Sequence, residues 1–340
     1  MKLLITGGCG FIGSNFIRHI VENYPDYTIV NLDALTYAGN PENLRDIENS
    51  PRYRFTHGKI EDTATVKKLM KEADCVVNFA AESHVDRSIL DAQPFLMTNI
   101  VGTHVLLEVA KESGIKRFIH ISTDEVYGTL PPQSASGGDE SEKFSEESRF
   151  KPNSPYAASK ASGDLLVRAY YETYRLPVII VRPSNNYGPY QFPEKFIPLM
   201  ITNLLQGEPI PIYGKGENVR DWLYVEDNCK AIDIILHKGK IGEAYNVGGD
   251  GEMNNIALAK NVLSMMGKNE SSIKFVQDRP GHDYRYALNN SKIEKELGWN
   301  PSVKIEEGLQ NTIQWYKENE WWWQPLKERL SAESKGFWEK

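Results

Sequence analysis

A glycine-rich turn near the N-terminus constrains the fold of this chain more than any other feature. The run Gly8-Cys9-Gly10-Phe11-Ile12-Gly13 has the spacing Gly-x-Gly-x-x-Gly, and Gly7 adds the wider Gly-x-x-Gly-x-x-Gly spacing. It lies between a strand-like run at residues 3–6 and an amphipathic stretch at residues 13–22. Glycines in such a strand–turn–helix unit let the backbone approach a pyrophosphate, whose charge then lies at the helix N-terminus. The turn therefore predicts a dinucleotide-binding βαβ unit.

The first half of the chain alternates short β-branched runs with amphipathic stretches. We expect strands at residues 3–6, 28–32, 54–57, 75–79, 117–121 and 178–182, and helices at 13–22, 63–71, 94–113 and 155–174. This alternation predicts a parallel sheet covered on both faces, with ligands at the carboxyl ends of its strands.

Two units are expected, because Pro and Gly become frequent between short segments after about residue 185. The predicted class is α/β, with a Rossmann-type doubly wound NAD-binding domain over residues 1–184. Segments near 221–250 and 305–320 are expected to pack back onto it. Residues 185–340 are expected to form mainly a smaller, irregular α/β substrate domain, and residues 131–148 a surface loop.

Composition excludes several functions. The net charge of −7 argues against nucleic-acid binding, and the 40% hydrophobic content is ordinary for a soluble globular protein. No apolar run approaches the roughly 20 residues that span a bilayer, and the N-terminus shows no signal-peptide pattern, so a cytoplasmic protein is expected. Cys9, Cys75 and Cys229 read as reduced thiols, and neither they nor His84 and His282 have zinc-site spacing, so no metal is predicted.

Asp33 indicates which dinucleotide is bound. It ends the second expected strand, about 20 residues after Gly13, where a carboxylate can accept hydrogen bonds from both ribose hydroxyls. The same charge repels the 2′-phosphate of NADP. NAD is therefore the predicted cofactor.

Tyr156 and Lys160 form a candidate acid/base couple. They are four positions apart on an expected helix and so share one face. A nearby ammonium is expected to lower the phenol pKa and to help tyrosinate take a hydroxyl proton while hydride moves to a nicotinamide. With Thr123 upstream and the glycine turn, the chain resembles the extended short-chain dehydrogenases/reductases over nearly its whole length. That group includes nucleotide-sugar epimerases, decarboxylases and dehydratases.

Asp124 and Glu125 favour a dehydratase within that group. Beside a sugar oxidised at C4, one carboxylate can remove the acidic C5 proton while a carboxylic acid protonates the departing C6 hydroxyl. The string Thr-Asp-Glu-Val-Tyr-Gly at 123–128 resembles that of the dTDP-glucose 4,6-dehydratases, whereas UDP-glucuronate decarboxylases typically have Ser in place of Asp124. The resemblance implies Tyr156 as the base at C4, Thr123 orienting that hydroxyl, Glu125 as the C5 base and Asp124 as the acid toward C6, with Lys160 completing the catalytic set.

The resemblance also implies two sets of binding residues. The cofactor set is Gly7, Gly10, Phe11, Ile12, Gly13, Asp33, Ala34, Leu35, Thr36, Lys59, Ile60, Ala80, Ala81, Ser83, Thr98, Tyr156, Lys160 and Asn186. The substrate set is Ser83, His84, Thr123, Asp124, Glu125, Asn185, Lys195, Phe196, Pro211, Tyr213, Arg220, Asn255, Arg279 and His282. Arg220 and Arg279 suit a diphosphate because guanidinium forms paired charged hydrogen bonds. The chain departs from the family pattern at Lys59, Tyr284 and Asn289, where Asp, Arg and Asp are usual.

The resemblance implies dTDP-glucose as substrate, a tightly bound NAD regenerated in each turnover, and a homodimer whose helices at 94–113 and 155–174 form a four-helix bundle. A 6-deoxyhexose pathway such as dTDP-rhamnose synthesis is the expected setting. Three alternatives stay open: a UDP- or CDP-glucose 4,6-dehydratase, a 4-epimerase, and a catalytically silent NAD-sensing protein. The tryptophans at 321–323 are expected to pack against the body or a partner subunit.

Overall fold

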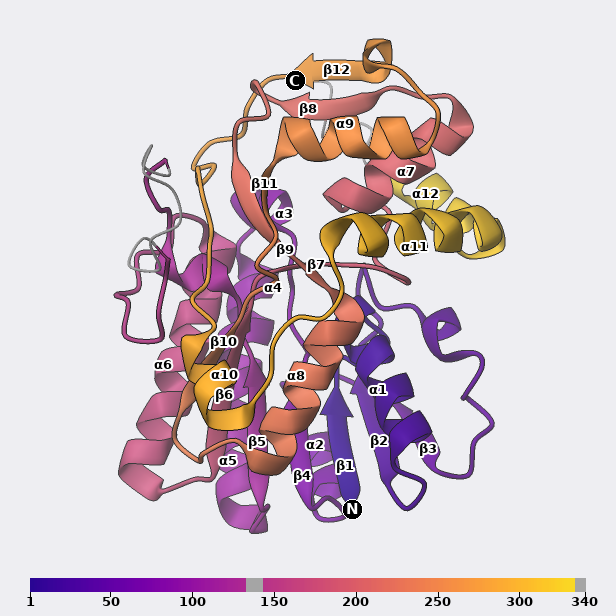
Figure 1. Ribbon diagram of the computed structural model, residues 1–340. Coiled ribbons are helices and arrows are strands. Elements are labelled where there is room, and N and C mark those ends of the chain that lie inside the picture. The colour runs from indigo at the N-terminus through magenta and orange to yellow at the C-terminus, as the bar shows by residue number, and fades with distance from the viewer. Residues whose placement is uncertain (133–142, 334–340) are drawn as a thin grey trace.

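The computed structural model describes residues 1–132 and 143–333 (Figure 1). The middle of the expected loop at 131–148 lies outside these residues. Within them, seven strands form one sheet in the order β10-β6-β5-β4-β1-β2-β3, and every neighbouring pair is parallel. The strands are β1 (Lys2–Thr6), β2 (Thr28–Asp33), β3 (Tyr53–His57), β4 (Cys75–Asn78), β5 (Arg117–Ile121), β6 (Val178–Pro183) and β10 (Ala244–Val247). The predicted doubly wound α/β class is confirmed.

Helices cover both faces of this sheet because its strands are apolar on both sides. Leu3 and Ile5 of β1 belong to a core shared with α1 (Phe11–Asn23) and α8 (Val225–Lys238). Leu4, between them, faces the opposite core, which is built with α2 (Thr63–Met70), α5 (Thr103–Ser113) and α6 (Pro155–Tyr174). Alternation along one strand thus supplies two cores.

The helix expected at 94–113 is not uniform. It begins as α4 (Gln93–Phe95), widens into a π-helical segment at Leu96–Gly102 and continues as α5. The helix expected at 94–113 is therefore present, and the π-helical turn within it is a feature that residue spacing does not reveal. The widened segment holds the buried Asn99, whose side-chain amide donates to the Glu82 carbonyl oxygen at 3.0 Å and to Ser159 Oγ at 2.8 Å.

The remaining elements form a cap above the carboxyl ends of the strands (Figure 1). A small sheet has the order β11-β9-β7, and β8 pairs with β12. The strands are β7 (Asn185–Tyr187), β8 (Ile210–Tyr213), β9 (Val219–Tyr224), β11 (Glu252–Asn254) and β12 (Ile273–Val276). The cap helices are α7 (Phe196–Gln206), α9 (Asn255–Met265), α11 (Ile305–Glu318) and α12 (Glu320–Glu333). The short elements α3 (Val85–Leu90), α10 (Ser291–Leu297), η1 (Pro41–Leu44), η3 (Asp124–Tyr127) and η5 (Glu270–Ser272) complete the described chain.

The C-terminal helix α12 joins the cap to the N-terminal half. Trp322 and Trp323 are buried, whereas Trp321 is 49% exposed. Trp322 Nε1 donates to Asn43 Oδ1 at 2.8 Å, and the Arg329 guanidinium donates to the carbonyl oxygen of Tyr37. Two of the three tryptophans therefore pack against the body of the subunit.

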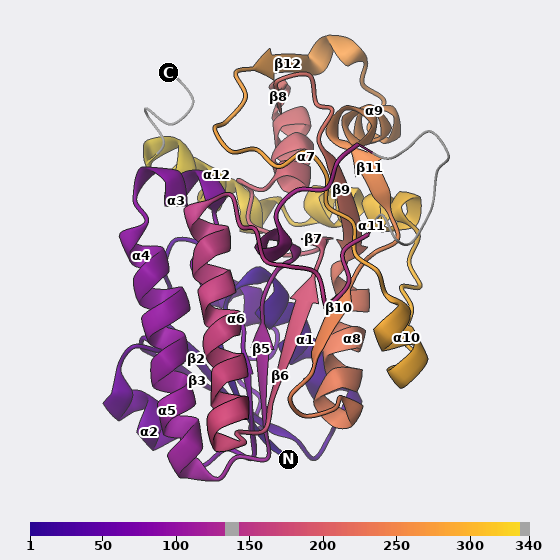
Figure 2. The same cartoon turned by 90° about the vertical axis from the view of Figure 1, so that its left-hand side faces the viewer.

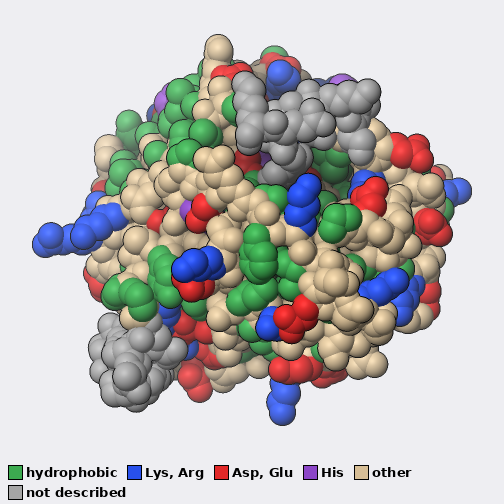
Figure 3. All heavy atoms as spheres, turned by 90° about the horizontal axis from the view of Figure 1, so that it is seen from above, with side chains coloured by type: hydrophobic (Ala, Val, Ile, Leu, Met, Phe, Trp, Pro, Cys, Tyr) green, Lys and Arg blue, Asp and Glu red, His purple; other side chains and the backbone are tan. Residues whose placement is uncertain are grey.

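Two further features are the charge on the cap surface and the apolar character of the helices. Acidic and basic side chains are interspersed on the cap face (Figure 3). Among the residues that the structure describes, no helix combines the length and the apolar character needed to cross a membrane.

Candidate active site

A cavity of about 560 Å³ lies where the sheet meets the cap. Its walls come from the turn after β1 and from the residues that follow β2, β4, β5 and β6. Parallel strands bring these segments together at one edge of the sheet. The cavity is therefore at the position that the strand pattern predicts for a ligand.

The glycine turn fits a dinucleotide pyrophosphate. A Cβ on Gly13 would overlap the Gly7 carbonyl oxygen, and Gly7 itself has φ +71°. Gly10 caps α1 without a side-chain hydrogen bond, and the first turn of α1 contains no acidic residue. The amides of this 13-residue helix thus remain directed at the cavity edge, where a phosphate would bind.

Asp33 lies at the end of β2 and lines the cavity. Its carboxylate accepts hydrogen bonds from the amides of Cys9 and Leu35, both at 2.8 Å. Burial raises the pKa of Asp33, and these two amide hydrogen bonds oppose that rise. The carboxylate is therefore held rigidly against the glycine turn, where it can accept from ribose hydroxyls.

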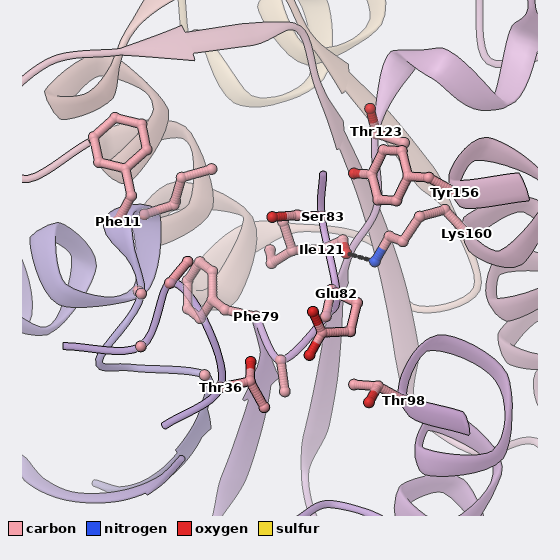
Figure 4. A pocket seen from close by; sticks show the side chains of 18 of the residues that line it. Phe11, Thr36, Phe79, Glu82, Ser83, Thr98, Ile121, Thr123, Tyr156 and Lys160 are labelled. Carbon is pink, nitrogen blue, oxygen red and sulfur yellow. Dashed lines mark hydrogen bonds between the residues drawn. The ribbon is translucent and has the colours of Figure 1, made fainter. Parts of the chain in front are cut away.

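The side chains of Thr123, Tyr156 and Lys160 converge in the cavity (Figure 4). Lys160 Nζ donates to the Ile121 carbonyl oxygen at 2.6 Å, and burial lowers the Lys160 pKa to about 8. The expectation that the phenol pKa falls was wrong for the protein as described. Burial raises the Tyr156 pKa first, the charge of Glu125 raises it further, and the hydrogen bond with Thr123 only partly opposes them. The Lys160 ammonium is bound to a carbonyl oxygen rather than to the phenol.

The carboxyls of Asp124 and Glu125 have different environments although the residues are adjacent. Thr123 Oγ1 caps η3 by accepting from the Glu125 amide at 3.3 Å, which places both residues in the first turn of that short helix. Asp124 is 2% exposed and its Oδ2 is buried without a hydrogen-bond partner, so burial raises its pKa well above the usual range. Burial also raises the Glu125 pKa, but Arg279 and Arg220 oppose the rise. Two guanidinium groups thus favour the ionised form of Glu125, whereas burial and the neighbouring Glu125 favour the protonated form of Asp124.

The cap supplies cations that face Glu125. The guanidinium of Arg220 is buried and donates to the carbonyl oxygens of Val219, Asp283 and Tyr284. Arg279 Nη1 bonds Asp86 Oδ1 at 3.0 Å, while its Nε is buried without a hydrogen-bond partner. Positive charge therefore gathers between the sheet edge and the cap, as an anionic ligand requires.

The structure brings most of the sequence-predicted residues to the cavity. The lining residues from the two expected sets are Gly7, Gly10, Phe11, Ile12, Gly13, Asp33, Ala34, Thr36, Lys59, Ile60, Ala80, Ala81, Ser83, Thr98, Thr123, Asp124, Glu125, Tyr156, Lys160, Asn185, Asn186 and Lys195. The expected residues outside the lining are Leu35, His84, Phe196, Pro211, Tyr213, Arg220, Asn255, Arg279 and His282.

Leu35 and a group of cap residues are among those outside the lining. Leu35 follows Asp33 directly with a φ of +50°, and its backbone, not its side chain, supports the carboxylate. Several of the cap residues cluster: Tyr213 donates to Asp86 Oδ2 at 3.0 Å, and its ring lies 5.9 Å from that of His282. This cluster shares Asp86 with Arg279.

Sequence reasoning missed several lining residues. Glu82 points into the cavity (Figure 4), and burial raises its pKa while a hydrogen bond with Thr36 lowers it. Tyr37 and Phe192 also line the cavity and lie edge-to-face with ring centroids 5.8 Å apart. Glu82 lies between Ala81 and Ser83, which the family resemblance placed in the cofactor set, so those neighbours were a usable signal. Nothing in the local sequence of Tyr37 or Phe192 marks them.

The three departures from the family pattern have different locations. Lys59 lines the cavity beside Ile60. Tyr284 supports the cap through its backbone, since its amide donates to Thr129 Oγ1 at 2.9 Å. Asn289 Oδ1 accepts from the Ser291 amide at 2.8 Å next to α10. Within residues 1–132 and 143–333, no three His, Cys, Asp or Glu side chains are grouped as a metal site would require.

The parallel sheet, the glycine turn and the Thr123–Tyr156–Lys160 set define a short-chain dehydrogenase/reductase of the extended type. The family model described as GDP-mannose 4,6 dehydratase matches residues 4–312, and the chain belongs to this family. The family resemblance stated from the sequence is confirmed.

Individual relatives and solved structures give more specific similarities than the family model does. The chain is 49% identical to a dTDP-glucose 4,6-dehydratase of Salmonella typhimurium, covering 95% of this chain and 94% of that protein. A dTDP-glucose 4,6-dehydratase from Streptomyces venezuelae, solved with NAD bound, is similar in structure, with a TM-score of 0.91 and 49% sequence identity. The match covers 96% of this chain and 100% of that chain. A UDP-glucuronic acid 4-epimerase from Bacillus cereus, also in complex with NAD, has a TM-score of 0.85 at 30% identity, covering 94% of this chain and 99% of that chain.

Proposed function

We propose that this protein is an NAD-dependent dTDP-glucose 4,6-dehydratase. It oxidises dTDP-glucose at C4, eliminates water across C5 and C6, and reduces C6 to give dTDP-4-keto-6-deoxyglucose. The observation that carries the proposal is the Asp124–Glu125 pair at the end of β5, in one cavity with Tyr156 and Lys160. Near full-length relatives at 48–49% identity that carry the name support the substrate.

The residues present fit NAD. The amides at the start of α1 suit the pyrophosphate, Asp33 suits a ribose diol, and Tyr156, Lys160 and Thr98 lie along the same cavity. When bound, NAD takes up hydride at the C4 step and returns it at C6 within the same turnover.

Tyr156 is the base for the C4 hydroxyl. Its phenol shares a hydrogen bond with Thr123, which fits Thr123 as the group that orients the same hydroxyl. The raised phenol pKa in the protein alone means that deprotonation needs added positive charge nearby. Lys160 stands one helical turn away to supply part of it.

Asp124 and Glu125 perform the elimination. Burial of Asp124 raises its pKa and so favours its protonated form, which can give a proton to the C6 hydroxyl as that group leaves. Glu125, facing Arg220 and Arg279, is the carboxylate that accepts the C5 proton. Water forms from the departing hydroxyl and the Asp124 proton, so the step balances without another reactant.

The diphosphate of the substrate is assigned to the cap. Arg220 and Arg279 are charged donors between the cap and the sheet edge, and Lys195 Nζ, which donates to the Ser83 carbonyl oxygen at 3.0 Å, lines the cavity beside them. Asn185 and Asn255 each have a side-chain oxygen buried without a partner, which suits them to donors on a nucleotide sugar.

An epimerase is the nearest alternative, because a UDP-glucuronic acid 4-epimerase shares the fold at 30% identity. Epimerisation at C4 needs no acid at C6, and the buried Asp124 carboxyl, whose pKa is raised, favours the dehydratase. The chemistry of UDP-glucose or CDP-glucose dehydration would use the same groups. A silent NAD sensor has no need of the converged Thr123, Tyr156 and Lys160.

We further propose a homodimer formed through α5 and α6, in a cytoplasmic 6-deoxyhexose route such as dTDP-rhamnose synthesis. The two helices lie side by side (Figure 2). Exposed apolar side chains lie along this region: Leu96 at 47% and Val101 at 39% on the π-helical segment, and Leu165 at 57% on α6. Such a patch suits a two-fold contact between identical helix pairs.

The test of function is incubation of the purified protein with dTDP-glucose in heavy water, followed by mass spectrometry and NMR. We expect loss of one water, deuterium at C5 and no net NADH. An unchanged mass with inverted C4 would establish the epimerase instead. Parallel reactions with UDP-glucose and CDP-glucose report the preferred base, and no turnover with any of the three would reject the proposal.

A further inference from the structure

A row of buried polar side chains crosses the sheet just below the candidate active site. Thr6 on β1 donates to Asn78 Oδ1 on β4 at 2.6 Å, and Asn78 lies 3.2 Å from His120 Nδ1 on β5. His120 Nε2 is 3.7 Å from Asp164 Oδ1, and each of these two atoms is buried without a hydrogen-bond partner. Burial lowers the His120 pKa well below its usual range, so the ring is neutral.

Arg182 on β6 is the centre of this row. Its Nε donates to Asp164 Oδ2 at 2.8 Å, and its Nη1 donates to the Tyr127 hydroxyl at 2.8 Å. The Tyr127 hydroxyl in turn donates to Asn246 Oδ1 on β10 at 2.8 Å. Arg182, Asp164 and Tyr127 are 5%, 1% and 1% exposed, so solvent does not compete for these bonds.

The two partners of Arg182 belong to the two catalytic segments. Asp164 is on α6, one turn beyond Lys160, and Tyr127 is the last residue of η3, which begins with Asp124 and Glu125. The Arg182 guanidinium therefore contacts both α6, whose Tyr156 and Lys160 are assigned to oxidation, and η3, whose Asp124 and Glu125 are assigned to elimination.

The segment η3 needs an external support. It is a four-residue 3-10 helix, and the next residue, Gly128, has φ +81°. A helix this short is not stable by itself. Tyr127 fixes its end through its hydroxyl and through stacking on Phe144, with ring centroids 5.0 Å apart.

We propose that Arg182, with Asp164 and Tyr127, is a positioning unit that sets the spacing between the Tyr156–Lys160 pair and the Asp124–Glu125 pair. It thereby coordinates C4 oxidation with the elimination that follows. This inference rests on the proposed function for its kinetic consequence. None of the three residues touches the substrate in this assignment, and a buried ion pair by itself is weak support for stability, so their role is to fix geometry.

The test uses single-turnover kinetics of the NAD-loaded full-length enzyme with dTDP-glucose. NADH absorbance rises with C4 oxidation and decays as C6 is reduced after elimination. In Tyr127→Phe, which loses only the hydroxyl, we expect a decay about tenfold slower and a rise within about twofold of wild type, because small misplacements of a catalytic group are costly. Asp164→Asn weakens the contact between Arg182 and α6, the helix that carries Tyr156 and Lys160. We therefore expect the rise to slow about tenfold and the NADH transient to disappear.

Tyr245→Phe is the matched control. Tyr245 is equally buried and its hydroxyl donates to Glu296 Oε2 at 2.9 Å, away from the catalytic segments. We expect unchanged rise and decay in this variant. Equal slowing of both phases in Tyr127→Phe, no slowing, or the same pattern in Tyr245→Phe would overturn the proposal.

Hydrogen–deuterium exchange on the NAD-saturated protein without sugar gives a readout independent of the reaction. Amides of residues 122–128 should exchange at least about threefold faster in Tyr127→Phe than in wild type or Tyr245→Phe. Unchanged exchange there would reject the positioning unit even if dTDP-glucose proves not to be the substrate. Failure of wild type to dehydrate dTDP-glucose would reject the proposed function while this comparison still decides the inference.

Discussion

At the scale of single residues, the main feature of the site is that the neighbouring carboxyls of Asp124 and Glu125 have different environments. Asp124 is enclosed and its charge is further disfavoured by Glu125, whereas Glu125 faces two guanidinium groups. In the proposed mechanism, these environments favour Asp124 as the acid and Glu125 as the base before any substrate binds.

Asp124→Asn tests the acid. The amide keeps the shape but cannot donate a proton to a leaving hydroxyl, so kcat for dehydration should fall about 10²- to 10³-fold. C4 oxidation should persist, which a stopped-flow NADH signal would detect. Asp26→Asn, at an exposed position, should behave as wild type. A variant that dehydrates at the normal rate would remove Asp124 from the mechanism.

The pH dependence of kcat should be bell-shaped. On the acid side activity needs ionised Glu125, whose pKa is raised, so the loss should begin above the ordinary glutamate pKa of about 4.3. On the alkaline side Lys160 loses its proton near its pKa of about 8, and activity should fall as pH rises through that value. Lys160→Arg keeps the charge and should move the alkaline limb upward. An unmoved limb in that variant would assign it to another group.

At the scale of elements, close packing at the start of α1 makes the glycine turn intolerant of any side chain. In Gly13→Ala the new methyl would overlap the Gly7 carbonyl oxygen, which is backbone and cannot move aside cheaply. We expect NAD affinity, measured by calorimetry, to weaken about 10- to 100-fold, and the melting temperature to fall by a few degrees because overpacking costs about 1–3 kcal/mol. Gly207→Ala supplies a control at a position with open space, although its positive φ lowers stability slightly. Normal NAD affinity in Gly13→Ala would contradict the fit.

Elements with strong patterns could be predicted from the sequence. The six expected strands all occur; five of them are largely buried, whereas β3 is a mostly exposed strand at the edge of the sheet. The strand β10 was not among them, since Ala-Tyr-Asn-Val is short and its place in the sheet depends on pairing with β6. The π-helical turn could not be predicted for a similar reason. The hydrogen bonds of its Asn99 side chain go to Glu82 and Ser159, which are distant in the sequence.

The candidate site could be predicted as far as local motifs extend. The glycine turn, Asp33, the Thr123–Glu125 segment and Tyr156 with Lys160 all line the cavity. Tyr37 and Phe192 could not be found this way because they meet only when the cap closes over the sheet. The pKa of Tyr156 was predicted in the wrong direction because spacing reveals the nearby lysine but not the burial or the charge of Glu125.

At the scale of the whole molecule, the exposed apolar patch predicts the assembly state. Leu165→Glu places a charge at the proposed contact of α6, and we expect sedimentation velocity to show a monomer where wild type is a dimer. Leu205→Glu, 37% exposed on α7, is the matched control and should leave the dimer intact. A Leu165→Glu protein that still sediments as a dimer would place the interface elsewhere.

The contacts of α12 also bear on the order in which the protein is made. Trp322 bonds Asn43 and Arg329 bonds Tyr37, and these pairs are separated by 279 and 292 positions. A nascent chain leaving the ribosome can assemble β1 to β6 early, whereas the contact of Arg329 with Tyr37, a residue of the cavity wall, forms only after α12 has been translated. The contacts that join α12 to the N-terminal half are therefore formed late in synthesis, after most of the sheet.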